Sequence, residues 1–108
     1  MTIYRAMCHE EMVKTINNGY ASFDTKRYKW FSQNLEFIVN RVMDKKFNNS
    51  KFKSHRYTYL LEFEWNGNNC DFISTNEIQF DRRKNPKIKF IKTLLALPRK
   101  TEGILNVL

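Results

Sequence analysis

Three segments of this sequence place a cation, a hydroxyl and a carboxylate where strands are expected to begin or end. Arg5 lies inside the apolar segment 3–7, Ser32 follows an aromatic pair, and Glu77 precedes the apolar segment 78–80. A guanidinium among apolar residues is costly unless it is paired or binds an anion such as phosphate. A carboxylate at a strand start can stabilise a developing cation or orient a nucleophile. Brought into one cleft, these groups are the features of the chain that indicate a specific chemistry.

Each of these residues also has a simpler explanation. The alternation of a strand could point Arg5 to solvent or into an ion pair with an acid such as Glu62. Ser32 stands where a helix N-cap is expected, and the amide groups of a helix N-terminus also favour anions. Glu77 could be an exposed glutamate at the edge of a strand. The sequence leaves both kinds of role open for all three residues.

Alternating strands and helices are expected in the first half of the chain. Residues 2–7 are typical of a strand, and residues 9–17 of a short amphipathic helix that stops at Gly19. Aromatic side chains concentrate in residues 28–31, which predicts a short buried strand. In residues 33–43 the apolar positions recur with helical spacing, which predicts a helix capped by Ser32.

Strands are expected in the second half. Residues 57–65 alternate between two faces, and residues 66–69 predict a hairpin-type turn into residues 70–74. Residues 76–81 and 87–94 predict further strands, separated by a basic turn. This order predicts one α+β domain over residues 1–108, with mainly antiparallel strands and two short N-terminal helices. Its core spans about residues 2–94, and the structure of the C-terminal tail, 95–108, is not indicated.

The charge of the chain points to anionic partners. Nineteen Lys and Arg residues against eleven Asp and Glu give a net charge of +8. A positive surface attracts polyanions, so nucleic acid is the first partner to consider. The alternative is a solvated, solubilising surface without a binding role. The cationic clusters that flank the expected strands, and that we predict to contact nucleic acid, include Lys51, Lys53, Arg56, Arg82, Arg83 and Lys84.

The cysteines, histidines and apolar windows set further expectations. Cys8 and Cys70 do not form a dense framework, so we expect free thiols in a reducing compartment. With His9 they do not make a four-ligand zinc set, and we expect no metal site. No window approaches ~18 consecutive apolar residues, and the N-terminus lacks the pattern of a signal peptide. We therefore expect a cytoplasmic protein that does not contact membranes.

In order and spacing, the segments around Arg5, Ser32 and Glu77 resemble a compact ADP-ribosyltransferase of the Arg-Ser-Glu toxin type. The resemblance covers roughly residues 2–94. It includes Tyr4-Arg5-Ala6-Met7, the helix ending at Gly19, Trp30-Phe31-Ser32, the strand 57–65, Thr75-Asn76-Glu77-Ile78 and the strand 87–94. It implies an ADP-ribosyltransferase-like fold and NAD as the substrate.

The resemblance also implies a role for each of the three residues. Arg5 would hold the dinucleotide phosphates and Ser32 would support the nicotinamide-ribose region. Glu77 would be the catalytic residue, which stabilises the oxocarbenium-like state and positions the acceptor. Glycosidic cleavage of NAD builds positive charge on the ribose beside a diphosphate, which agrees with a carboxylate and a cation in these roles.

Two positions depart from the family pattern. Gln33 follows Ser32 where the family has Thr-Ser, and Thr75 stands where a Glu or Gln marks arginine- or asparagine-type acceptors. The class of acceptor is therefore open, and the charge of +8 favours a nucleic acid or a nucleic-acid-associated protein. An inhibitor protein that covers the cleft is a further partner to consider.

Two other functions fit parts of the sequence. The first is a small basic protein that binds nucleic acid or modulates a host without catalysis. The bases of the nucleic acid would stack on Tyr28, Trp30, Tyr57 or Tyr59. Aromatic residues at strand spacing are, however, more often core residues. The second is a toxin-like ribonuclease that uses His55, in the basic segment 51–56, as a general acid or base.

Overall fold

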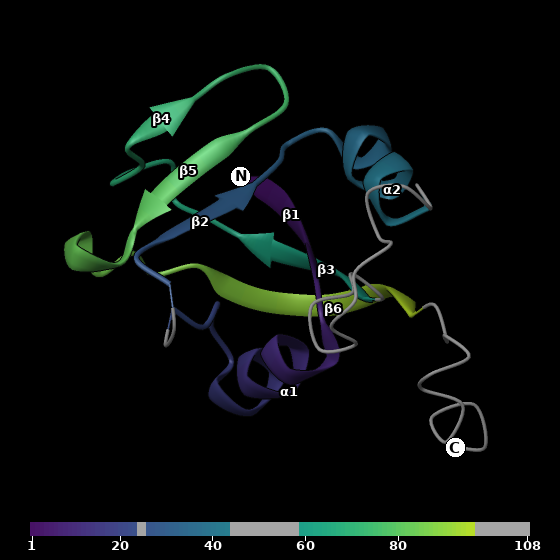
Figure 1. Cartoon of the computed structure of the whole chain (residues 1–108). Coiled ribbons are helices and arrows are strands. Elements are labelled where there is room, and N and C mark those ends of the chain that lie inside the picture. The colour runs from purple at the N-terminus through teal and green to yellow at the C-terminus, as the bar shows by residue number, and fades with distance from the viewer. Residues whose placement is uncertain (24–25, 44–58, 97–108) are drawn as a thin grey trace.

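The computed structural model describes residues 1–23, 26–43 and 59–96 (Figure 1). Its order of elements confirms the predicted α+β class in one small domain. In chain order they are β1 (Thr2–Met7), α1 (His9–Asn18), β2 (Tyr28–Phe31), α2 (Leu35–Met43), β3 (Tyr59–Glu64), β4 (Phe72–Ile73), β5 (Ile78–Asp81), the 3₁₀ turn η2 (Arg82–Lys84) and β6 (Lys89–Ala96).

The strands form two antiparallel three-stranded sheets that meet at one point. Their strand orders are β1-β3-β6 and β2-β5-β4. Tyr4 N donates to Ser32 O at 2.8 Å, and Ser32 N donates to Tyr4 O at 2.9 Å. In the described part of the chain, no other residues of β1 and β2 pair with each other. The two sheets therefore diverge beyond it, and side chains fill the space between them.

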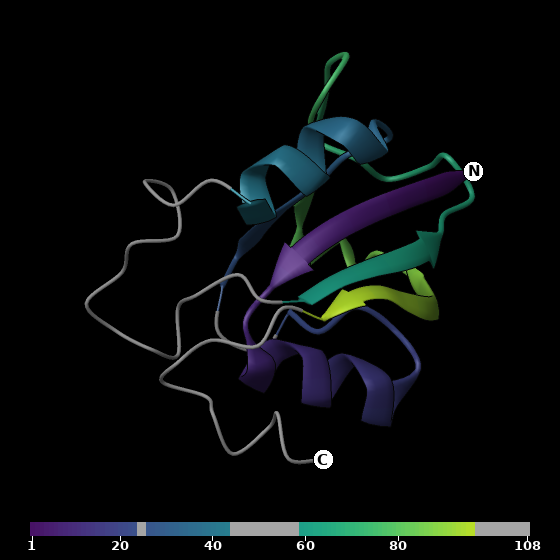
Figure 2. The same ribbon diagram turned by 90° about the vertical axis from the view of Figure 1, so that its right-hand side faces the viewer.

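The two helices cover opposite faces of the β1-β3-β6 sheet (Figure 2). Ile38 and Val42 of α2 pack against Ala6 and Leu60 in one apolar cluster. The larger cluster lies on the other face of β1 and between the sheets, and contains Ile3, Met7, Phe31, Leu61, Phe63, Trp65, Ile78, Phe80 and Ile88. Because side chains alternate along a strand, Arg5 shares the face of β1 that carries this cluster.

The ends of the helices agree with the sequence for α1 and correct it for α2. Gly19 follows α1 with φ 77°, and its N–H donates to Thr15 O at 2.9 Å. α2 begins at Leu35, two residues later than predicted, and Asn34 caps it by accepting from Phe37 N at 3.2 Å. The prediction that Ser32 is the N-cap was wrong. Its Oγ instead accepts from Asn34 N at 2.9 Å, in the turn before the helix.

The predicted hairpin after β3 is also wrong. The turn at residues 66–69 exists, with Gly67 at φ 88° and Asn69 at φ 65°, but it carries the chain from one sheet to the other. β3 pairs with β1 and β6, whereas β4 pairs with β5. The last strand continues to Ala96, two residues beyond the predicted end. Residues 57–58 and 97–108, including most of the C-terminal tail, lie outside the described residues.

Candidate functional site

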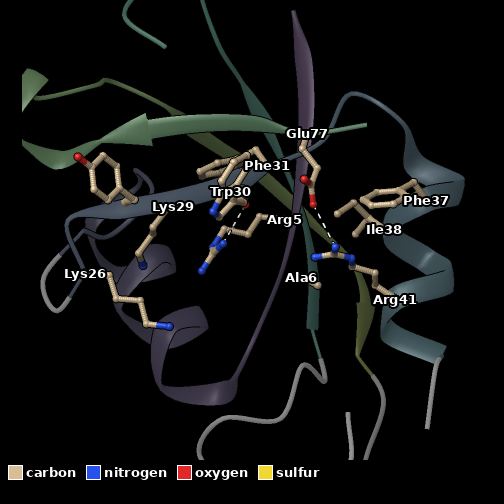
Figure 3. Close-up of a pocket in the computed structure, with 11 residues that line it drawn as sticks. Arg5, Ala6, Lys26, Lys29, Trp30, Phe31, Phe37, Ile38, Arg41 and Glu77 are labelled. Carbon is tan, nitrogen blue, oxygen red and sulfur yellow. Dashed lines mark hydrogen bonds and ion pairs between the residues drawn. The ribbon is translucent and has the colours of Figure 1, made fainter. Parts of the chain in front are cut away.

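A pocket of about 120 Å³ opens where β1 and β2 diverge, beside α2 (Figure 3). Its lining combines positive charge with aromatic rings, which suits an anion that carries a planar group. Among the described residues, the lining contains the cations Arg5, Lys26, Lys29 and Arg41, the carboxylate Glu77, and the aromatic residues Tyr28, Trp30, Phe31 and Phe37. Figure 3 shows Arg5, Lys26 and Lys29 on one side of the pocket and Glu77 with Arg41 on the other.

Arg5 connects the two sheets just beyond their bridge. Its Nε and Nη2 donate to the two carboxylate oxygens of Glu11 at 2.6 and 3.0 Å. Its Nη1 donates to the carbonyl oxygen of Trp30 at 2.8 Å. Since β5 pairs with the other edge of β2, the guanidinium takes the place of a neighbouring strand at this carbonyl. The acid beside Arg5 is thus Glu11 of α1, not Glu62.

A second cation shares Glu11 with Arg5. Lys29 Nζ lies 3.2 Å from Glu11 Oε2, and the side chain of Lys29 is only 3% exposed. Arg5 and Glu11 are 11% and 17% exposed. Two largely buried cations thus lie beside one carboxylate, and cations placed close together in this way favour an anionic ligand.

The pKa values of this cluster show which interactions dominate. Burial lowers the pKa of the Lys29 ammonium, and the attraction of Glu11 opposes the shift without cancelling it. Burial alone would raise the pKa of Glu11, but the charges and hydrogen bonds of Arg5 and Lys29 together outweigh it. The pKa of Glu11 therefore lies below its ordinary value, and the carboxylate stays ionised at neutral pH.

Glu77 lies directly before β5, beside a short turn that Ser74 closes. Ser74 N donates to Glu77 O at 2.8 Å, and Glu77 N donates to Ser74 Oγ at 3.2 Å. The Glu77 carboxylate accepts a hydrogen bond from Arg41 Nη2 at 3.0 Å, and the two side chains are 32% and 39% exposed. A pair this exposed contributes little to stability, so a ligand can exchange with either partner at low cost.

Ser32 lies beside the pocket and is not part of its lining. The residue is fully buried, its hydroxyl is used in the turn before α2, and its backbone forms the bridge to β1. Its observed contribution is to fix the point at which the two sheets separate. The structure thus brings Arg5 and Glu77 into the lining of one pocket and leaves Ser32 outside that lining.

Four charged residues of the site were missed by sequence reasoning, namely Glu11, Lys26, Lys29 and Arg41. One signal was available for Lys29. Lys29 and Phe31 share the inward face of the strand 28–31, and a lysine at an inward position requires a partner or a ligand. The other three contacts depend on which helix and loop pack beside the strand.

The predicted nucleic-acid-binding residues fall into two groups. Arg82, Arg83 and Lys84 are exposed on the 3₁₀ turn η2, which begins where Asp81 Oδ1 accepts from Arg83 N at 2.9 Å. Lys51, Lys53 and Arg56 lie outside the described residues, as do His55 and Tyr57. His9, the other histidine, lies with its Nδ1 3.0 Å from the hydroxyl of Tyr59.

Within the described ranges, no group of three or more His, Cys, Asp and Glu side chains is arranged to hold a metal ion. Cys8 and Cys70 are both free thiols. Neither α1 nor α2, the α-helices of the described residues, is long and apolar enough to cross a membrane. Comparison of the chain with protein families, characterised proteins and solved structures gives no match.

Proposed function

We propose that this protein is an ADP-ribosyltransferase that binds NAD between β1 and β2 and transfers ADP-ribose to a nucleic acid or a nucleic-acid-associated protein. One observation carries the proposal. Arg5 and Glu77, which lie 72 positions apart in the sequence, line the same pocket, and the described residues of its lining include four cations and one carboxylate. An ADP-ribosyltransferase-like fold is part of the same proposal.

The cations on one side of the pocket suit the diphosphate of NAD. Arg5 and Lys29 both contact the Glu11 carboxylate, so two cations lie close together here. A diphosphate would bind these cations through charge-assisted hydrogen bonds.

The carboxylate on the other side suits the reacting ribose. Cleavage breaks the bond between the ribose and the nicotinamide nitrogen, and the electron pair leaves with nicotinamide. Positive charge then develops on the ribose, where the Glu77 carboxylate would stabilise it. The acceptor atom forms the new bond to the same carbon and loses its proton to the carboxylate or to water. Arg41 donates a hydrogen bond to the Glu77 carboxylate, and a substrate would exchange with this partner when it binds.

The test uses the full chain with NAD labelled in its adenylate half. We expect NAD hydrolysis in the absence of an acceptor and transfer of label to nucleic acid in its presence. Glu77→Gln should reduce both rates at least ~100-fold, because it removes the charge that stabilises the transition state. Glu36→Gln, at an exposed position in the first turn of α2, is the matched control and should keep the wild-type rates.

Two results would refute the proposal. One is the absence of NAD binding and hydrolysis in a chain whose thermal unfolding shows it to be folded. The other is an equal rate in the Glu77→Gln and Glu36→Gln variants, which would place the chemistry elsewhere.

A further inference from the structure

The outer face of the β2-β5-β4 sheet carries exposed aromatic side chains. Tyr28 is 40%, Trp30 39% and Phe72 49% exposed. Trp30 and Phe72 share this face because both pair with Gln79 in register, and their rings meet edge to face with centroids 5.9 Å apart. Tyr28, two residues before Trp30, lies on the same face. These three rings, which we call the aromatic face, are large apolar groups where a solvated sheet normally carries polar ones.

Cations border the aromatic face. The Arg27 guanidinium lies 4.8 Å from the centroid of the Tyr28 ring, and the carbonyl oxygen of Arg27 accepts from Arg82 N at 2.6 Å. The turn η2 therefore lies beside Tyr28. Lys84, in the same turn, forms an ion pair with Asp71, the residue before Phe72, so η2 also contacts the segment that leads into β4. Residues 27, 71 and 81–84 contain four cations, Arg27, Arg82, Arg83 and Lys84, and two carboxylates, Asp71 and Asp81.

We infer that the aromatic face binds single-stranded nucleic acid. Bases stack on the exposed rings, and phosphates contact the bordering cations. Two of these residues, Tyr28 and Trp30, also belong to the lining of the pocket that contains Glu77, so a strand bound to the aromatic face lies next to that pocket. Binding is inferred from the aromatic face itself, and only its role as the acceptor site rests on the proposed function.

The exposed rings favour single-stranded nucleic acid over other polyanions. The cations of η2 alone would suit a duplex, a single strand or an acidic protein equally. In a duplex the bases stack on one another and do not expose their flat faces, whereas unpaired bases are free to stack on aromatic side chains. A row of exposed rings next to an excess of positive charge is complementary to unpaired bases on a phosphate backbone.

The experiment measures binding of fluorescent oligo-dT and oligo-U, each of about 12 nucleotides, to the full chain by anisotropy without NAD. Phe72→Ala should weaken binding by about tenfold, and Phe72→Trp should keep wild-type affinity because it keeps a ring. Phe72 is chosen because it does not line the pocket. Tyr20→Ala is the matched control. Its ring is 47% exposed and lies 5.8 Å from Lys87 Nζ, but Tyr20 bridges to Lys89 at the start of β6, in the other sheet.

A second pair of measurements tests the cations and the choice of a single strand. Arg82→Glu combined with Arg83→Glu should weaken binding and lower its dependence on salt concentration. A duplex of the same length should bind more weakly than either single strand. Equal losses in Phe72→Ala and Tyr20→Ala, equal affinity for duplex and single strand, or no binding to either oligonucleotide would overturn the inference.

The outcome does not depend on the proposed activity. Binding that is lost in Phe72→Ala, in a protein that does not consume NAD, would support the aromatic face and refute the transferase. NAD hydrolysis in a protein that binds neither oligonucleotide would do the reverse.

Discussion

Replacing Glu11 with glutamine tests the charge balance on which the site depends. Glu11 accepts two hydrogen bonds from Arg5 and lies 3.2 Å from the ammonium of Lys29. A glutamine has nearly the same shape but no charge, and it has one acceptor oxygen in place of two. In the variant, two neighbouring cations therefore lose their shared negative charge.

The size of the effect follows from the burial of the three side chains. The side chains of Lys29, Arg5 and Glu11 are 3%, 11% and 17% exposed, so solvent compensates little for the lost charge. Removing one partner of a buried ion pair costs about 3–5 kcal/mol, and the partial exposure of Glu11 favours the lower value, about 3 kcal/mol. For a domain of this size, that loss lowers Tm by about 12–24 °C. It is a large share of a total stability of about 5–15 kcal/mol.

The assay is thermal and urea unfolding of both proteins at several pH values. The pKa of Glu11 is lowered by folding from an ordinary value of 4.5, so its stabilising contribution is complete above that value. The contribution is lost as pH falls below 4.5 and through the folded-state pKa. The difference in unfolding free energy between wild type and Glu11→Gln should therefore be largest near neutral pH and shrink in acid.

The neighbouring residue provides the control. Glu10 is 67% exposed in its pair with Lys14, and Glu10→Gln should change the unfolding free energy by less than about 0.5 kcal/mol. Adding Lys29→Met to Glu11→Gln should recover part of the loss, because it removes one of the two cations that shared the carboxylate. A loss in Glu11→Gln no larger than that in Glu10→Gln would refute the reasoning.

Two further predictions concern Lys29 and the cap of α2. Because burial lowers the pKa of Lys29, removing its charge should not reduce stability. Lys29→Met should leave Tm unchanged or higher. It should weaken the binding of pyrophosphate, measured by calorimetry, about tenfold relative to the control Lys14→Met. Equal affinities in the two variants would exclude Lys29 from the anion site. Asn34→Ala removes the side chain that caps α2 and should cost about 1 kcal/mol, or about 4–8 °C in Tm. Asn40→Ala, exposed within the same helix, should not lower Tm, and a similar loss in both variants would contradict the assignment of the cap.

The elements of the fold could be predicted from the sequence because their signals are local. The strand at residues 2–7 and the helix that stops at Gly19 follow from side-chain periodicity and from a glycine with positive φ. The positions of Arg5 on a strand and Glu77 at the start of another follow in the same way. Helix caps are less certain at this level, since Ser32 and Asn34 are both good capping residues and only the backbone decides between them.

The pairing of strands and the charge cluster were decided by the tertiary structure. The sequence indicates a turn after β3 but not that β3 pairs with β6, because that choice depends on burying Leu61 and Phe63 between the sheets. Likewise, Arg5 was recognisable as a cation that needs a partner. That the partner is Glu11, shared with Lys29, depends on where α1 packs. Attraction between charges acts through space, so residues distant in sequence become one site only when the packed elements bring them within a few ångströms.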